Sequence, residues 1–336
     1  MAVIGWDIGG VHVKVARVAN GAVLATTLAP CSIERDLETL PEVLRRLAHV
    51  VGATARDRHA ITMTAELSQR FRTKGEGVGA ILDAHRHAFP DATSAVLDTA
   101  GRLVDTDAAR ARPLAVAASN WVATATLAAR AVPDALLLDM GSTTTDIIPL
   151  VAGRVAAAGR TDPDRLASGE LVYTGALRTP IEAIVRAVPW RDGFARVSAE
   201  GFATTGDVHL WLGTLPEAAC TVPTADGRPA TRTFAAERLA RVACADRTMV
   251  TDADLDRIAL AVDAAQQAQL TEALGAVRAR HPGLSRALVT GIGDAIAARA
   301  ARASGWSATP LREAWGNAAD VAPAAAAGLL LESAHA

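Results

Sequence analysis

The sequence predicts an α/β protein built from two related domains. Two segments, at residues 2–16 and 136–149, each run from an apolar strand through an Asp and a Gly-containing turn into a second apolar strand. A third segment, at residues 286–294, runs from a strand through Gly-x-Gly into a helix. The repeated hairpin indicates an internal duplication, and a chain of 336 residues is long enough for two domains with separate cores.

The hairpin at residues 136–149 has a composition that suits a phosphate. Gly141 allows the backbone to turn without a Cβ clash and leaves amide groups open to a ligand. The four hydroxyl residues at 142–145 add donors for phosphate oxygens. Asp139 and Asp146 would repel the anion unless a metal ion lay between them, so the pattern implies Mg²⁺. An ordinary hairpin with a threonine-rich turn is the alternative.

The hairpin at residues 2–16 repeats the pattern with Asp7, Gly9 and Gly10, and adds Lys14 on the returning strand. Of the 34 basic side chains only two are lysines, Lys14 and Lys74, and both lie in segments that resemble site loops. Arginine can replace lysine on a surface but not where a compact ammonium is required. This bias indicates functional lysines, with chance retention as the alternative.

The remaining pattern divides the chain into domains at residues 1–132 and 133–316. In the first domain we expect a strand at 21–26 after the Asn20-Gly21 turn, and further strands at 59–64 and 95–98. A helix is expected to begin at a capping box at 39–42. A polar Gly-rich segment at 71–78 leads into another helix, and a continuous helix is expected at 114–132. In the second we expect a turn and strand at 151–155, a helix capped by residues 179–182, a substrate-facing insertion of loops and short strands at 189–230, and helices at 234–243 and 252–280. A closing helix at 317–334 is expected to pack back on the first domain.

Several polar residues follow predicted strands, where open α/β sheets bind ligands. Glu66 and Lys74 fall in such loops, although Glu66 could also be a solvated carboxylate at a helix start. Residues 169–180 bring together Glu170, the only tyrosine, Tyr173, and Arg178. Tyr173 either lines a pocket or is a buried tyrosine at a strand edge. The Gly-x-Gly junction at 291–293 is expected to point backbone amides at an anion.

Composition excludes several classes of protein. The net charge of −2 gives no basic footprint, so nucleic acid is not an expected partner. The three cysteines are widely spaced, which argues against a zinc cluster and fits a reducing cytoplasm. His209 has no second His or Cys at ligand spacing, so a structural role is expected for it. The N-terminus enters a strand directly, and no apolar run is long enough to span a membrane, so neither a signal peptide nor a membrane anchor is expected.

The paired Asp-x-Gly hairpins resemble those of the acetate kinase, sugar kinase, Hsp70 and actin superfamily. That resemblance implies two actin-like domains, of the ribonuclease H-like kind, with a phosphorylated ligand in a cleft between them. A closer resemblance is to a hydantoinase/oxoprolinase-related family that accompanies tetrahydromethanopterin-linked one-carbon metabolism. It is carried by the segments Asp7-Ile8-Gly9-Gly10-x-His12-x-Lys14, Met63-Thr64-x-Glu66-Leu67, Phe71-x-Thr73-Lys74-x-Glu76-Gly77-Val78, Ala118-Ser119-Asn120-Trp121, Asp139-x-Gly141 through Pro149, and Gly169-Glu170 through Pro180. Ala65 stands where the family pattern has Gly.

The resemblance implies a transferase of methanofuran or methylofuran biosynthesis. Such an enzyme joins an (aminomethyl)furanyl-methyl diphosphate to the phenol oxygen of a tyramine or tyrosine derivative and releases diphosphate. We expect catalysis by Lys74, Glu66, Asp146, Glu170 and Lys14, substrate and phosphate binding by Gly9, Gly10, His12, Gly141, Ser142, Thr143, Thr144, Tyr173, Arg178, Gly291 and Gly293, and Mg²⁺ binding by Asp7 and Asp139. The sequence does not decide which carboxylate is the catalytic base, which phenol is the acceptor, or whether the protein forms a homo-oligomer. The alternatives are an ATP-dependent kinase or oxoprolinase-like enzyme, and a nucleotide-binding scaffold without turnover.

Overall fold

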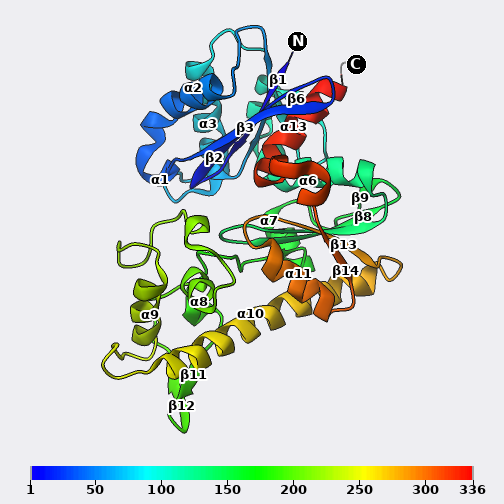
Figure 1. Cartoon of the computed structure of the whole chain (residues 1–336). Coiled ribbons are helices and arrows are strands. Elements are labelled where there is room, and N and C mark those ends of the chain that lie inside the picture. Colours follow the sequence, from blue (N-terminus) through cyan, green and yellow to red (C-terminus); the bar gives the residue numbers. More distant parts are fainter. Residues whose placement is uncertain (1, 335–336) are drawn as a thin grey trace. The chain divides into compact units, whose positions relative to one another are not determined.

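The computed structural model describes residues 2–334, which form two compact units (Figure 1). The first unit contains the chain up to Ala135, Leu150–Arg165 and the chain from Leu311 onward. The second contains Leu136–Pro149 and Leu166–Pro310. The expected boundaries at 132/133 and 316/317, and the expected cleft between two domains, stay predictions. No helix in residues 2–334 is long and apolar enough to span a bilayer.

The first unit is organised around a six-stranded sheet of order β3-β2-β1-β4-β5-β6. Its strands are β1 (Val3–Ile8), β2 (His12–Ala19), β3 (Ala22–Pro30), β4 (Arg58–Met63), β5 (Ser94–Leu97) and β6 (Leu103–Asp105). The β1–β2–β3 meander is antiparallel, and β4 and β5 continue the sheet parallel to β1. Asn20 and Gly21 have positive φ angles of 54° and 72°, as the predicted hairpin turn requires.

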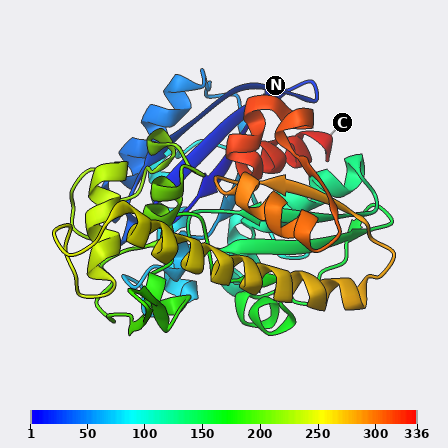
Figure 2. The same ribbon diagram turned by 60° about the horizontal axis from the view of Figure 1, so that its bottom comes forward.

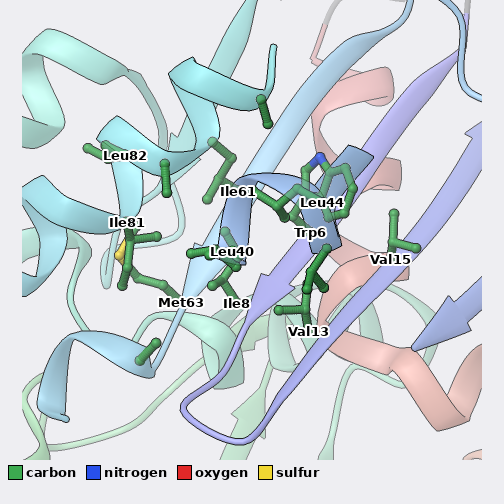
Figure 3. Packing of buried hydrophobic residues seen from close by; sticks show 14 of the residues in the cluster. Trp6, Ile8, Val13, Val15, Leu40, Leu44, Ile61, Met63, Ile81 and Leu82 are labelled. Carbon is green, nitrogen blue, oxygen red and sulfur yellow. The ribbon is translucent and has the colours of Figure 1, made fainter. Parts of the chain in front are cut away.

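The first unit also contains helices, several of which cover the sheet through apolar side chains, and the start of α7 (Asp162–Ser168). The helices are α1 (Ile33–Asp36), η1 (Leu37–Thr39), α2 (Leu40–Val50), η2 (Ala65–Leu67), α3 (Lys74–Ala88), α4 (Thr106–Ala111), α5 (Pro113–Val116), α6 (Asn120–Ala131), α12 (Arg312–Trp315), η5 (Gly316–Val321) and α13 (Ala322–Ser333). In Figure 3, Leu40 and Leu44 of α2 and Ile81 of α3 pack with Trp6 and Ile8 of β1. Helix α13 packs on β1 and β2. A Cβ at Gly5 would lie 1.9 Å from the Ala324 carbonyl oxygen, so this contact requires glycine.

Three helix predictions for this unit need correction. Thr39 forms no capping box, because it ends η1 and its hydroxyl donates to the Asp36 carbonyl. The continuous helix expected at residues 114–132 is two helices, α5 and α6, separated at residues 117–119. The closing α-helix begins at Ala322, after the 3₁₀ turn η5, and not at residue 317.

The second unit contains most of a mixed sheet of order β10-β8-β7-β13-β14, with β9 paired to β8. The strands of this sheet are β7 (Ala135–Met140), β8 (Thr145–Val151), β9 (Arg154–Val155), β10 (Leu171–Val172), β13 (Arg286–Thr290) and β14 (Ser307–Pro310), of which β9 and the end of β8 belong to the first unit. The other elements are η3 (Ile181–Ala183), the hairpin β11 (Ala187–Trp190) and β12 (Gly193–Arg196), α8 (Thr205–Leu212), η4 (Glu217–Ala219), α9 (Arg232–Arg241), α10 (Asp252–Arg280) and α11 (Asp294–Ala303). Figure 2 shows the long α10 with α9 beside its first turns.

Two predictions for the second unit also need correction. Residues 179–182 cap no α-helix and lead only into the 3₁₀ turn η3. The insertion at residues 189–230 is not only loops and short strands, because Thr205–Leu212 forms α8 with a capping box between Thr204 and Asp207. The predicted structural role of His209 is confirmed in part by its place on this buried helix.

Candidate active site

The acidic hairpin of the first unit pairs a carboxylate with an ammonium group. Lys14 is the cross-strand partner of Asp7, and its Nζ atom lies 3.3 Å from Asp7 Oδ2. Asp7 is only 3% exposed, and its Oδ1 atom has no hydrogen-bond partner among the described residues. The hairpin therefore presents an acceptor oxygen beside a positive charge.

The turn between β1 and β2 brings a second loop close to it. The Gly9 amide donates to the His12 carbonyl at 3.0 Å, and a Cβ at Gly9 would lie 2.9 Å from that oxygen. The Cβ position of Gly10 faces open space. After β4, the Thr64 amide donates to the Ile8 carbonyl at 3.0 Å, which places the loop containing Glu66 beside the glycine turn.

Glu66 lies in η2 and is 1% exposed, and neither of its carboxylate oxygens has a hydrogen-bond partner within residues 2–334. Burial raises the pKa of Glu66 to about 7. The nearby amides of Glu66 and Ala118 and the Lys74 ammonium lower that pKa only in part, and the Asp162 carboxylate raises it. A carboxyl group with a pKa near neutrality can exchange a proton or meet a cation.

The start of α3 positions both Lys74 and Glu66. The Thr73 side chain caps the helix by accepting from the Glu76 amide, and Lys74 is the first helical residue. Lys74 Nζ lies 2.7 Å from Asp162 Oδ2, a partner 88 residues away. A Cβ at Gly77 would lie 2.6 Å from the Glu66 carbonyl oxygen, so only glycine lets α3 approach η2 this closely.

The break between α5 and α6 completes this group of loops. Ala118 has a φ angle of +49°, which is unusual for a residue with a Cβ. Its amide acts on Glu66, and the next residue, Ser119, bonds through its side chain to Thr62 at 3.0 Å in a fully buried position. Strain held in place by buried contacts is typical of functional sites.

The acidic hairpin of the second unit has the same turn. The Gly141 amide donates to the Thr144 carbonyl at 2.9 Å. Asp139 lies opposite Thr290 of β13, and a Cβ at Gly291 would lie 2.5 Å from Asp139 Oδ1. Gly291 also has a φ angle of +89°, so glycine is required there on two grounds.

The two hairpins are equivalent in register. Asp7 lies opposite Thr62 on a parallel neighbour strand, as Asp139 lies opposite Thr290. In both sheets the returning strand of the hairpin pairs on the other side. This correspondence confirms the internal duplication that the sequence predicts.

A loop after β10 lies on the second glycine turn. Its backbone bonds run from the Ala176 amide to the Gly141 carbonyl and from the Leu177 and Arg178 amides to the Ser142 carbonyl. A Cβ at Gly175 would lie 2.5 Å from the Thr143 backbone. Arg178 Nη1 lies 3.5 Å from Thr143 Oγ1. The structure thus brings Gly141, Ser142, Thr143, Thr144 and Arg178 together at the second glycine turn, and it places Gly291 against Asp139.

A buried hydrogen-bond network of Gln266 and His209 holds the loop at Thr174–Gly175. Gln266 Nε2 donates to Thr174 Oγ1 and to the Gly175 carbonyl, both at 2.9 Å. His209 joins Gln266 and Thr214 through its two ring nitrogens, also at 2.9 Å. Burial lowers the pKa of His209, which favours the neutral form of the ring. His209 therefore orders the loop.

The structure gives the surroundings of four further predicted residues. The Gly293 amide donates to the Met140 carbonyl at 2.9 Å, so it is not available to an anion in this structure. Asp146 lies on β8 opposite Leu171, beyond the turn. Glu170 is fully buried and pairs with Arg280 at 3.3 Å. Tyr173 is 59% exposed, so it is not the buried strand-edge tyrosine of the second reading.

Of the two predicted Mg²⁺ ligands, Asp7 is the one whose surroundings indicate how it could bind the ion. No group of three His, Cys, Asp or Glu residues in the described part of the chain could hold a metal ion by itself. Asp7 Oδ1, however, is a buried oxygen without a partner among residues 2–334. Mg²⁺ is commonly bound by one or two carboxylates together with substrate phosphates, so Asp7 fits such a site when a phosphorylated substrate supplies further oxygens.

Solved structures define the class of fold. Component A of (R)-2-hydroxyglutaryl-CoA dehydratase from Acidaminococcus fermentans superposes with a TM-score of 0.52, 11% identity and 99% coverage of both chains. A ROK family glucokinase from Streptomyces griseus, solved with glucose and AMPPNP, gives 0.51, 11% and 98% of each chain. The chain thus has the actin-like α/β fold predicted for it.

Sequence comparison gives the family. Residues 57–331 match the hydantoinase/oxoprolinase family, and the chain belongs to it. A relative from Methanocaldococcus jannaschii, the (4-{4-[2-(gamma-L-glutamylamino)ethyl]phenoxymethyl}furan-2-yl)methanamine synthase, is 35% identical over 296 residues, covering 88% of this chain and 87% of that protein. Such similarity over almost the whole length supports a biosynthetic enzyme and confirms the predicted family resemblance.

Proposed function

We propose that this protein is a transferase that condenses an (aminomethyl)furanyl-methyl diphosphate with the phenol oxygen of a tyramine or tyrosine derivative and releases diphosphate. The product would belong to a methanofuran-type or methylofuran-type cofactor of one-carbon metabolism. The observation that carries the proposal is the 35% identity with a synthase of the aminomethyl-furanyl phenyl ether over 88% of the chain. The family match and the phosphate-suited hairpins agree with it.

The departing diphosphate is the group that most needs stabilisation. A furanylmethyl carbon loses diphosphate readily because the ring delocalises the developing positive charge. The chain would therefore act mainly by binding the leaving anion and orienting the nucleophile. In this proposal Lys14 and Lys74 supply positive charge, and the Gly9-Gly10 turn and residues 141–144 supply backbone and hydroxyl donors. Bound Mg²⁺ would neutralise diphosphate charge, and Asp7 and Asp139 are the two candidate ligands that the sequence predicts for it.

The bonds and protons balance without ATP. The phenol oxygen forms a bond to the furanylmethyl carbon as the bond from that carbon to the diphosphate oxygen breaks. The phenol proton, which has a pKa of about 10 in solution, passes to a carboxylate or to the released diphosphate. Glu66, Asp146 and Glu170 are the candidate acceptors. Glu170 is engaged with Arg280, which makes it the weakest of the three.

An omission experiment tests the proposal. The purified protein is incubated with the furan diphosphate, tyramine and Mg²⁺, and then with each component left out in turn. We expect diphosphate release only in the complete mixture, with one diphosphate per ether. A parallel incubation supplies ATP as well, and formation of ADP there would instead favour the ATP-dependent kinase or oxoprolinase-like alternative, which the actin-like fold also accommodates. Tight ATP binding without any product would favour a nucleotide-binding scaffold.

A further inference from the structure

We propose that Glu66 binds the primary ammonium group of the furan substrate and so selects substrates that carry it. This inference rests on the proposed function, because it names the substrate group that one buried side chain recognises. The relative's product is a furanyl methanamine, so an amine is part of the molecule that the relative makes. A primary alkylamine is protonated at neutral pH, as a lysine side chain is.

The starting observation is a buried carboxylate without a partner. Glu66 is 1% exposed, and both its oxygens lack a hydrogen bond within the described residues. An ionised carboxylate buried in this way costs several kcal/mol unless a cation and hydrogen-bond donors meet it. An ammonium group supplies three N–H donors and a positive charge. Its arrival would satisfy both oxygens at once.

Two cations of the first unit, Lys74 and Arg165, each contact a residue other than Glu66. Lys74 is the nearby cation that acts on Glu66, but its ammonium group lies 2.7 Å from Asp162. When Glu66 is ionised, it and Asp162 carry two negative charges near the one positive charge of Lys74. Arg165, another buried cation of this unit, stacks on the Trp121 ring at 4.1 Å from its centroid. A monovalent cation beside Glu66 would give the ionised carboxylate the direct partner that it lacks among the described residues.

The position of Glu66 also fits a group at the far end of a phosphorylated substrate. Thr64, two residues before it, bonds to Ile8 beside the Gly9-Gly10 turn. A ligand with its phosphates at that turn and its ammonium group at Glu66 would span neighbouring loops at one edge of a single sheet. The phenol proton can pass to another acceptor, because the furanylmethyl carbon is activated by departure of the diphosphate and not by the base. Glu66 is thus better suited to recognition than to proton transfer.

A double comparison of variant and substrate tests this assignment. The wild type and Glu66→Gln are assayed with the aminomethyl-furan diphosphate and with the same diphosphate carrying a methyl group in place of the aminomethyl group. Sites built to pair a substrate N–H reject analogues that lack it by large factors. We expect the wild type to prefer the amine by at least about 100-fold in kcat/KM, and Glu66→Gln to reduce the preference to less than about 10-fold. Glu42→Gln, an exposed glutamate of α2, is the matched control and should keep the wild-type preference.

If Glu66 were the base, both substrates would lose rate equally in Glu66→Gln, and an unchanged preference of this kind would overturn the proposal. A binding experiment separates this failure from failure of the proposed function. Furan-2-ylmethanamine is titrated calorimetrically into both proteins, with furan-2-ylmethanol as the neutral control. We expect the amine alone to bind, and only to the wild type. Equal binding to Glu66→Gln would also overturn the assignment, whereas amine-selective binding by a wild type that makes no ether would support it while the transferase function fails.

Discussion

The ammonium group of Lys74 lies 2.7 Å from the Oδ2 atom of Asp162. Lys74 begins α3 and Asp162 begins α7, and both side chains are about four-fifths buried within the first unit. The pair fixes the position of the ammonium group and leaves Glu66, the other carboxylate near Lys74, without a direct partner. A lysine held in this way is a fixed positive charge that a departing anion can use.

Removal of that charge should reduce catalysis more than stability. We expect Lys74→Ala to reduce kcat by at least about 100-fold, in the range of a lost electrostatic contact in the transition state. Asp162→Asn should reduce kcat less, because the ammonium group stays but is less well positioned. Steady-state kinetics with diphosphate detection measure both effects. Wild-type turnover in Lys74→Ala would remove this residue from the mechanism.

The carboxyl group of Glu66 should make stability fall as the pH rises. Burial raises its pKa from 4.5 in the unfolded chain to about 7 in the folded protein, so folding takes up a proton between these values. Glu66 alone therefore lowers the stability of the wild type by about 1.4 kcal/mol per pH unit across that window. Glu66→Gln does not titrate, and we expect it to be more stable than the wild type by about 3 kcal/mol at pH 8 and by little at pH 4.5. Urea unfolding at both pH values measures the difference, and a pH-independent difference would contradict this account.

Two glycines of α3 offer a matched pair of substitutions. Gly77→Ala places a methyl group 2.6 Å from the Glu66 carbonyl oxygen and 2.8 Å from the Phe71 ring, so α3 and η2 must separate. We expect a loss of about 1–3 kcal/mol, typical of overpacking. Gly79→Ala meets nothing closer than Arg110 Nη1 at 4.0 Å and should stabilise the helix by about 0.5–1 kcal/mol. Thermal unfolding of both variants tests the contact, and destabilisation of equal size would argue against it.

A buried pair of histidines should make the first unit sensitive to acid. His59 Nδ1 lies 2.9 Å from His85 Nε2 and accepts from Trp6 Nε1 at 3.3 Å. Burial lowers the pKa from 6.5 to about 4 for His59 and about 3 for His85. Their contribution to stability is complete above pH 6.5 and is lost as the pH falls below it, because the unfolded chain takes up protons that the folded state refuses.

The size of this effect follows from the number of titrating groups. Each histidine contributes a slope of about 1.4 kcal/mol per pH unit below pH 6.5. We expect His85→Gln to lower the slope between pH 6.5 and 5 by about 1.4 kcal/mol per pH unit relative to the wild type, as measured by urea unfolding. His87→Gln, at an exposed position on the same helix, should leave it unchanged. An unchanged slope in His85→Gln would show that the pair does not titrate on unfolding.

The features that could be predicted from the sequence are those that a run of consecutive residues determines. Both acidic hairpins and the strand-to-helix junction at Gly291 formed as predicted, because a strand pattern next to a glycine turn specifies its own geometry. The break before α6 could not be predicted. Alanine has the highest helix propensity, yet Ala118 adopts a positive φ angle beside the buried bond between Ser119 and Thr62. That bond links residues 57 apart, which no local pattern reveals.

The candidate site was predictable in residue type but not in pairing. Lysine scarcity identified Lys14 and Lys74, and the hairpins identified Asp7 and Asp139. Asp162 was missed because its partner lies 88 residues away and its own segment resembles an ordinary helix start. The network of His209 and Gln266 was also missed, since only the folded chain brings α8 and α10 to the Gly175 loop.

The fate of the phenol oxygen tests the central claim most directly. Tyramine labelled with ¹⁸O at the phenol is supplied with unlabelled aminomethyl-furan diphosphate, and the ether and the diphosphate are analysed by mass spectrometry. The account predicts that all of the label remains in the ether and none appears in diphosphate, because the carbon–oxygen bond of the diphosphate ester breaks. Label in diphosphate or in phosphate, or an ether that forms only when ATP is cleaved, would contradict it.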